Sequence, residues 1–229
     1  MKRNLFWSAL LVLLPQLCRG QGPSNIITLD FEGLKDHEKI MNYYNGGFGG
    51  GVMGGAPSGP GPNDGITFLS DSEALTSNQA GGSGNFRNEP SPNNVLFFLS
   101  GGGDIMNVSG GFTGGFSFFY SSPLAGTVTV WSGPNGTGTQ LASIDLPALQ
   151  LSSNVYDTWA PIGVAFNGAA GSVNFSGTAN FIAFDNVTLG SAVPTGAATP
   201  APSSLAVIAI AAAIGAGWRQ KRRWHSTPV

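Results

Sequence analysis

Short apolar runs separated by polar turn residues fill the middle of this chain. Phe116-Ser117-Phe118 and Val128-Thr129-Val130 alternate apolar and polar positions, which is the period of a strand with one buried face. Clusters of Gly, Asn, Ser and Pro, typical of turns, lie between the runs. The pattern predicts strands at Ile26–Phe31, Ile66–Leu69, Val95–Leu99, Ile105–Val108, Gly115–Tyr120, Thr127–Trp131, Gln140–Asp145, Trp159–Phe166, Ser172–Phe175 and Phe181–Leu189.

The connections between these runs complete the prediction. Residues 132–139 have the composition of a hairpin turn, and the Gly/Pro-rich stretch Gly46–Gly65 predicts a long surface loop. Lys35–Tyr44 has room for one short helix. Many short strands with regular turns favour an all-β domain over residues 23–190, a two-sheet antiparallel β-sandwich with a jelly-roll-like arrangement.

The N-terminus has the organisation of a secretory signal peptide. Lys2-Arg3 is the positive region, Leu5–Leu14 is apolar, and Cys18 and Gly20 supply small residues before cleavage at Gln21. We therefore expect residues 1–20 to be removed on export. Cys18 is the only cysteine, so the mature chain has no disulfide and depends on its core, and a bound metal is the other stabiliser that such a domain can use.

The C-terminus reads as a membrane anchor in three parts. A Pro/Ala/Thr linker at 191–204 leads to an apolar stretch at 205–218, predicted as one transmembrane helix, and then to a basic tail at 219–229. The apolar stretch is shorter than the roughly 20 residues of a stable span, which suits a transient anchor. Charged side chains are costly in hydrocarbon, so the cytoplasmic stop-transfer residues are Arg219, Lys221, Arg222 and Arg223.

The motif Pro200-Ala201-Pro202, the apolar stretch and the basic cluster together resemble the PEP-CTERM sorting tail of Gram-negative exoproteins, formerly labelled the ice-binding protein C-terminal domain. Ala201 stands where that family's motif has Glu. The resemblance implies an exosortase-type processing protease as partner, a transient stay in the inner membrane, and delivery to the cell surface or the extracellular space. An ordinary C-terminal anchor is the alternative.

The charge distribution narrows the range of partners. Residues 23–190 hold all twelve acidic residues and three of the ten basic ones, a net charge of −9. Such a domain repels the phosphates of nucleic acids, so we expect no nucleic-acid partner. Divalent cations and neutral glycans remain compatible with it.

Two short motifs resemble carbohydrate-binding-module-like β-sandwiches. Leu29–Leu34 opens the domain and Phe184–Leu189 closes it. In those modules an early Glu and a late Asp share a structural Ca²⁺, and the resemblance implies Glu32 and Asp185 as ligands, with Asp30 beside them. Carboxylate and carbonyl oxygens are the donors that Ca²⁺ takes. In the alternative, Asp30 and Glu32 are solvated on an edge strand and Asp185 caps a turn or accepts from a nearby backbone N–H.

Catalytic motifs are sparse. His37 is the only histidine of residues 23–190, and no G-x-S-x-G nucleophile elbow occurs. The sequence therefore predicts that the protein is not an enzyme. Aromatic rings that could stack on sugars from loop positions are those of Tyr43, Tyr44 and Tyr156.

Taken together, these features predict a secreted, non-enzymatic surface or matrix protein associated with exopolysaccharide. Two alternatives stay open. One is a carbohydrate-binding module with a specific glycan ligand, and the other is a glycoside-active hydrolase that uses a pair of the twelve carboxylates.

Overall fold

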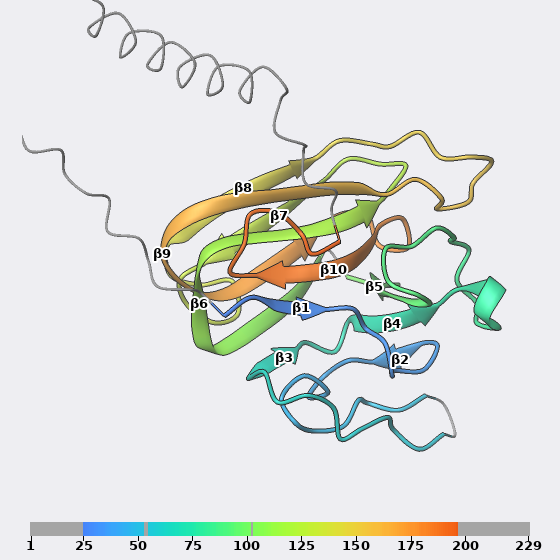
Figure 1. Ribbon diagram of the computed structural model, residues 1–229, viewed down its shortest axis with the longest axis horizontal. Helices are drawn as coiled ribbons and strands as arrows, with labels where there is room; N and C mark the ends of the chain where they lie inside the picture. Colours follow the sequence, from blue (N-terminus) through green and yellow to red (C-terminus); the bar gives the residue numbers. More distant parts are fainter. Residues whose placement is uncertain (1–24, 53–54, 102, 197–229) are drawn as a thin grey trace, which may run out of the picture.

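The computed structural model describes residues 25–52, 55–101 and 103–196, which form an antiparallel β structure (Figure 1). All strands join one hydrogen-bonded sheet in the order β2-β4-β5-β10-β6-β9-β7-β8, with β1 on β10 and β3 on β6. A single 3₁₀ turn, η1, follows β4. The elements are β1 (Ile27–Leu29), β2 (Glu38–Lys39), β3 (Ile66–Phe68), β4 (Ser72–Thr76), η1 (Asn78–Ala80), β5 (Asn94–Phe98), β6 (Gly103–Ser121), β7 (Gly126–Trp131), β8 (Gln140–Leu146), β9 (Ala160–Ser176) and β10 (Ala183–Leu189).

The two long strands β6 and β9 fold this sheet into two layers. The N-terminal half of β6 pairs with the C-terminal half of β9, with Asn107 opposite Ser172. This part of the sheet continues to β3 on one side and to β7 and β8 on the other. The C-terminal half of β6 pairs with the N-terminal half of β9, with Phe118 opposite Ile162. This part of the sheet continues through β10 to β5, β4 and β2. Register shifts between Asn107 and Gly114 mark the bend. We call these the β3/β8 layer and the β2/β10 layer.

Aromatic side chains fill the space between the layers. Phe118 of β6, Phe175 of β9 and Phe184 of β10 are fully buried and contact one another edge to face, with ring centroids 5.0–6.1 Å apart. Aromatic pairs prefer this edge-to-face geometry. The core therefore holds the β-sandwich together without disulfides, as the composition requires.

The loop Gly46–Gly65 is fastened to the domain by one carboxylate. Glu38 is fully buried; its Oε1 accepts from the Ser58 N–H at 2.6 Å, and its Oε2 accepts from the Lys35 N–H at 2.9 Å. Charge-assisted bonds of this kind are stronger than neutral ones. The loop is thus held at its middle and can position the residues at its C-terminal end.

The sequence-based strands are confirmed, with two differences in number. The two runs predicted within 105–120 are one strand, β6, and the two within 159–175 are one strand, β9. Strands β2 and β4 were not predicted, and the short helix at Lys35–Tyr44 is wrong, because turns and β2 occupy that stretch. The turn at 132–139 is confirmed by the Ser132 N–H bond to the Thr139 carbonyl, 2.9 Å. The two predicted sheets are one continuous hydrogen-bonded sheet, because β6 and β9 run through both layers. The jelly-roll arrangement stays a prediction.

The predicted targeting segments lie outside the described residues. This holds for the signal peptide at 1–20, for Pro200, Ala201 and Pro202, and for the anchor at 205–218 with its basic tail. Among residues 25–196, apart from the three that are not described, no helix is long and apolar enough to span a membrane. The domain boundaries stay predictions, although residues 191–196 pack on the domain, where Ser117 donates to the Ser191 carbonyl at 2.9 Å.

Candidate functional site

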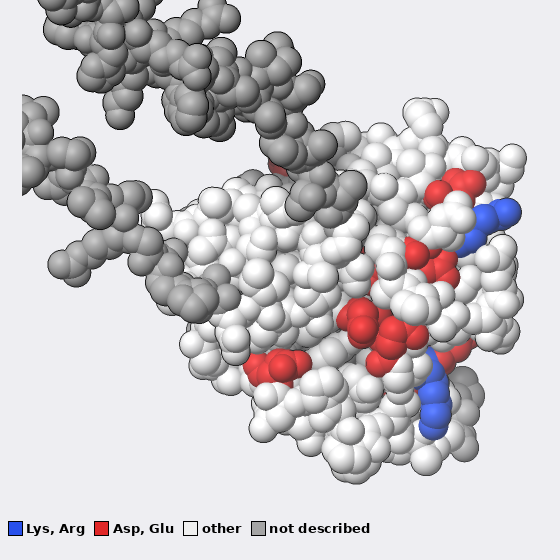
Figure 2. Space-filling view, in the orientation of Figure 1, with Lys and Arg blue, Asp and Glu red and all other residues white. Residues whose placement is uncertain are grey.

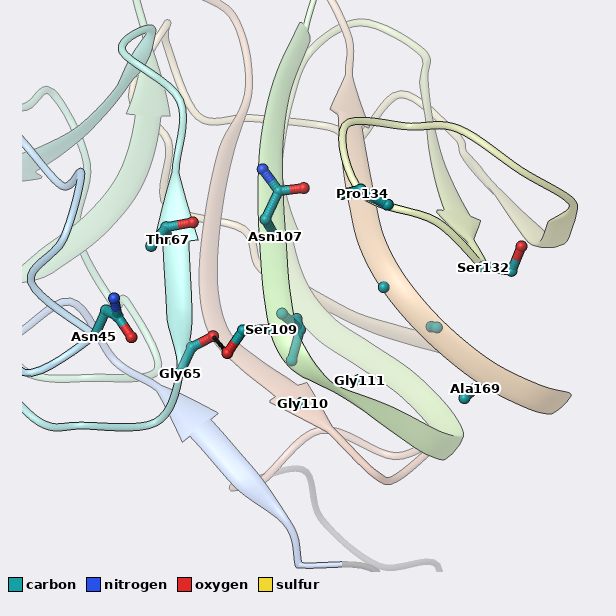
Figure 3. A pocket seen from close by; sticks show the side chains of 13 residues that line it. Asn45, Gly65, Thr67, Asn107, Ser109, Gly110, Gly111, Ser132, Pro134 and Ala169 are labelled. Carbon is teal, nitrogen blue, oxygen red and sulfur yellow. Dashed lines mark hydrogen bonds between the residues drawn. The ribbon is translucent and has the colours of Figure 1, made fainter.

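A pocket of about 600 Å³ opens on the outer face of the β3/β8 layer, where β6 and β9 bend. Thr67 and Asn107 come from the neighbouring strands β3 and β6, and Asn45 flanks them on one side (Figure 3). Ser132 and Pro134 flank them on the other side, from the turn that follows β7. The volume of the pocket lies in the range of about 300–1,000 Å³ that is usual for ligand sites.

Glycines shape the floor of this pocket. Gly65 and Gly111 have φ angles of +69° and +65°, in the left-handed region that glycine enters without strain. Ser109 fixes the edge by donating its N–H and its hydroxyl to the Gly65 carbonyl, at 2.9 and 3.0 Å. Gly110 is different, because a Cβ built there meets no atom within 4 Å. The floor at Gly110 is therefore open space.

The turn at 132–139 folds back over the sheet and forms one wall. Asn107 accepts the Asn135 N–H at 2.7 Å and donates its amide to the Asn135 side-chain oxygen at 2.8 Å. Ser172 donates to the Gly133 carbonyl at 2.6 Å and accepts from the Gly136 N–H at 2.9 Å. The wall is thus hydrogen-bonded to two neighbouring strands, so the pocket is preformed.

The lining is uncharged and combines amide and hydroxyl side chains with apolar surface. Amide and hydroxyl groups can both donate and accept, and the Asn107 amide keeps a second N–H beyond the one that Asn135 takes. Val108, Pro134, Ala169 and Ala170 contribute to the apolar part of the lining, which is larger than the polar part. Among the described residues that line the pocket, none is acidic, basic or aromatic. The arrangement suits a neutral, hydroxyl-rich ligand and supplies no group for acid–base catalysis.

The predicted calcium residues surround the junction of β1 and β10. Asp185 is fully buried; its carboxylate accepts from the Ser91 N–H and hydroxyl, each at 2.7 Å, and from the Asn186 N–H at 2.6 Å. Glu32 accepts from the N–H groups of Asn93 and Asn94, both at 2.8 Å. Asp185 therefore bonds nearby donors, as the alternative interpretation expected.

Burial, together with the charge of Glu32, raises the pKa of Asp185 to about 7. Asp30 lies next to them and accepts the Glu32 N–H at 3.1 Å. Carboxylates gathered in this way fit calcium in donor type and in charge. Within the described residues, however, no three His, Cys, Asp or Glu side chains converge on one point, so backbone carbonyls would have to supply the other ligands.

The three predicted tyrosines lie in different places. Tyr44 is 3 % exposed, accepts the Phe31 N–H at 2.7 Å and packs in the core, so its ring offers no face to a ligand. Tyr43 is half-buried against Tyr44, with ring centroids 5.2 Å apart. Tyr156 is half-buried and lines a second, smaller pocket. None of the three lines the larger pocket.

Sequence reasoning missed the residues of the larger pocket. Two short Gly/Ala-rich segments, 109–111 and 168–171, interrupt otherwise apolar strands and could have indicated a bend with open space beside it. The Asn107–Asn135 pairing joins residues 28 positions apart, and no local pattern announces it.

No family model and no curated protein matches the chain. Three solved structures show weak similarity to the chain, with TM-scores below 0.5. One is the K2 cleaved adhesin domain of Lys-gingipain, at 14 % identity and TM-score 0.40, covering 73 % of this chain and 98 % of that one. Another is a family 43 arabinoxylan arabinofuranohydrolase from Bacillus subtilis in complex with cellotetraose, at 21 % identity and 0.36, covering 52 % and 24 %. The isomalto-dextranase of Arthrobacter globiformis T6, complexed with panose, has 14 % identity and 0.33, covering 72 % and 32 %.

Proposed function

We propose that this protein is an exported glycan-binding β-sandwich whose ligand occupies the pocket at the bend of β6 and β9. The observation that carries the proposal is the uncharged, hydrogen-bonding lining of a preformed pocket of about 600 Å³. Sugars present hydroxyls that both donate and accept, and Asn45, Thr67 and Asn107 offer matching groups. The ligand class is a neutral polysaccharide, and the pocket binds it without turnover.

The charge of the domain supports a neutral ligand over an anionic one. Acidic side chains gather over the part of the molecule that holds β2, β4 and β5, whereas much of the opposite half of the same face shows no charge (Figure 2). A net charge of −9 over residues 23–190 repels polyanions at long range, and this repulsion weakens as salt rises.

The export and sorting route belongs to the same proposal. A signal peptide at 1–20 and a PEP-CTERM-like tail would pass the domain through the inner membrane and leave it at the cell surface or in the exopolysaccharide. A domain that binds neutral polysaccharide is suited to that location, because it would retain the protein in the matrix after the tail is cut.

Filling the pocket tests the proposal. Gly110→Gln adds a side chain at a position that lines the pocket and where a Cβ meets no atom within 4 Å, and the φ of Gly110 lies outside the left-handed region, so the fold should tolerate it. Ser143→Gln, on the exposed face of β8, adds the same side chain elsewhere. We expect the full-length chain to be retarded in native gels that contain a neutral β-glucan, xylan or dextran. Gly110→Gln should weaken that retention at least tenfold, and Ser143→Gln should not change it.

Three outcomes would contradict the glycan proposal. If no neutral polysaccharide in the panel retards the wild-type chain, or if both variants behave like the wild type, the pocket is not a glycan site. Retention by an anionic polysaccharide alone would also contradict the proposal.

We also propose a structural calcium between Glu32 and Asp185. A cation that binds only the folded state raises its stability by about 2.7 kcal/mol at a concentration 100-fold above the dissociation constant. Chelation should then lower the Tm, by about 2–4 °C per kcal/mol for a domain of this size. Asp185→Ala should abolish the calcium response of the Tm, whereas Asp145→Ala, on the exposed face of β8, should keep it. An unchanged Tm on chelation of metal-loaded wild type would exclude the site.

A further inference from the structure

A second pocket, of about 220 Å³, lies on the outer face of the β2/β10 layer. One side of it is apolar and is built from Leu75 of β4, Phe97 of β5 and Ala183 of β10, with Phe86 and Tyr156 over them. The other side is polar and consists of His37, Ser83, Asn85 and Asn180. This division into an apolar chamber and a polar rim does not occur in the glycan pocket, and nothing proposed above uses it.

The polar rim contains a serine, a histidine and a carboxylate in sequence. The Ser83 hydroxyl lies 2.7 Å from His37 Nε2, and His37 Nδ1 lies 3.5 Å from Glu73 Oε1. The two nitrogens of one imidazole thus face a hydroxyl on one side and an acid on the other. Of these two contacts only the Ser83–His37 one is a hydrogen bond, because Glu73 Oε1 has no hydrogen-bond partner among the described residues and approaches His37 at an ion-pair distance. A nucleophile within hydrogen-bond reach of a base, with an acid beside that base, is the arrangement by which hydrolytic serines are recognised, whatever the fold.

The exposure of each group suits its role. Ser83 is exposed and the His37 side chain is 43 % exposed, whereas Glu73 is 3 % exposed. A nucleophile must be reached by substrate, while the acid that orients the base acts best out of water. Glu73 Oε2 also lies 3.4 Å from Lys39 Nζ.

The backbone around the three residues is held in place. Asp36 accepts the Thr76 N–H at 2.8 Å and the Ser83 N–H at 3.0 Å, so it ties the loop that carries Ser83 to the loop that carries His37. His37 has a φ of +58°, in the left-handed region that non-glycine residues enter at a cost. Such strain often occurs at functional sites, where the surrounding structure holds it.

We propose that Ser83, His37 and Glu73 form a catalytic triad that hydrolyses esters of short acyl groups. Ser83 Oγ attacks the ester carbonyl carbon, and its proton moves to His37 Nε2. The C–O bond to the alcohol then breaks, and the alcohol leaves with that proton. Water attacks the acyl-Ser83 ester in the same way, releases the carboxylic acid and restores Ser83. Glu73 orients His37 and stabilises the imidazolium that forms when His37 takes the proton. The reaction consumes only the ester and water and requires no oxidant or cofactor.

The remaining parts of the pocket match this chemistry. The apolar chamber of Leu75, Phe97 and Ala183 receives the acyl chain, and its size limits that chain to a short one. The N–H groups of Gly82, Ser83 and Gly84 already donate to protein acceptors. The donors for the oxyanion are therefore the side-chain amide of Asn180 and the second N–H of the Asn85 amide, whose first N–H donates to the Asn154 carbonyl at 2.7 Å.

The experiment uses the full-length chain, a fluorophosphonate probe and p-nitrophenyl butyrate. Ser83 should displace fluoride from the probe, and peptide mass spectrometry should locate the adduct on Ser83. Ser83→Ala and His37→Ala should each lower the hydrolysis rate on the order of 10²-fold or more, and Glu73→Gln should lower it less. Ser143→Ala, on the exposed face of β8, is the matched control and should hydrolyse the ester like the wild type.

Two measurements keep the outcome decisive. Thermal melting of each variant separates a lost fold from a lost nucleophile, because Ser83 is exposed and its replacement should leave the Tm within about 2 °C of wild type. A folded wild-type chain that forms no adduct at Ser83 would overturn the proposal. So would ester hydrolysis that survives in a folded Ser83→Ala variant.

Discussion

Asp104 is a buried ionisable residue that lies away from the two pockets. It lies at the start of β6 with 1 % of its surface exposed, and desolvation raises its pKa to about 7. Neither carboxylate oxygen of Asp104 has a hydrogen-bond partner among the described residues. The charge of Asp71 adds to the rise of the pKa, whereas Lys39 opposes it. In water an aspartic acid has a pKa near 4. The folded state therefore binds a proton that the unfolded chain releases.

This proton makes stability depend on pH in a defined direction. Because the folded pKa is raised, ionisation favours the unfolded chain, and the free energy of unfolding should fall as pH rises from about 4 through 7. The Asp104 share of that fall is on the order of 2–3 kcal/mol between pH 5 and pH 8. Asp104→Asn should remove this share. Denaturant unfolding of both chains at several pH values would show it, and parallel pH profiles would contradict it.

The serine and histidine of the second pocket show what sequence cannot reveal at the scale of residues. Ser83 and His37 are 46 positions apart, and each stands in an ordinary polar loop. Glu32 and Asp185 could be singled out as candidate ligands because short motifs at the start and end of the domain contain them. Their hydrogen-bond partners, such as Ser91 for Asp185, depend on a contact across 94 positions.

At the scale of elements, the bend of β6 and β9 determines the architecture. The apolar alternation on both sides of it predicted strands correctly, because burial of one face has a local period. The continuity across the bend was not predictable, since Gly110 and Gly111 have the composition of a turn. Strand β4 was missed because Ser-Glu-Ala-Leu-Thr lacks the β-branched and aromatic character of a strand, and tertiary pairing with β5 overrides that propensity.

Substitutions of two neighbouring glycines at the bend should affect stability differently. Gly111 has a φ of +65°, and an added Cβ would lie 3.2 Å from the Ala170 carbonyl oxygen. Gly111→Ala should therefore cost about 1–2 kcal/mol of unfolding free energy. Gly110→Ala meets no atom within 4 Å and should be neutral within about 0.5 kcal/mol. Chemical denaturation of the two variants measures the difference, and equal stabilities would refute this account of the bend.

At the scale of the whole molecule, both ends of the described chain lie on one side of the sandwich. Strand β1 pairs with β10, and the hydroxyls of Thr28 and Thr195 are 2.8 Å apart (Figure 1). Thr195 also donates its N–H to Thr188 at 3.1 Å, which fastens the chain after the last strand.

Truncation tests how the tail relates to this domain. Deleting residues 205–229 should leave the fold intact and send the protein to the periplasm or medium, because the contacts of 191–196 remain. Deleting residues 191–229 removes those contacts and should lower the Tm.

Neutralising Arg219, Lys221, Arg222 and Arg223 should weaken membrane retention in cell fractionation. A 205–229 deletion that fails to fold, or neutral variants that stay in the membrane fraction unchanged, would contradict the anchor interpretation.

The glycan proposal depends on where a sugar binds, and the side-chain amide resonances of Asn45 and Asn107 report that directly, since both line the pocket. We expect a neutral oligosaccharide, taken from the polysaccharide that retards the full-length chain, to shift both resonances in NMR titrations with a common dissociation constant. Gly110→Gln should abolish both shifts. Shifts confined to residues outside the pocket, or titrations unchanged in Gly110→Gln, would contradict the assignment of this pocket as the glycan site.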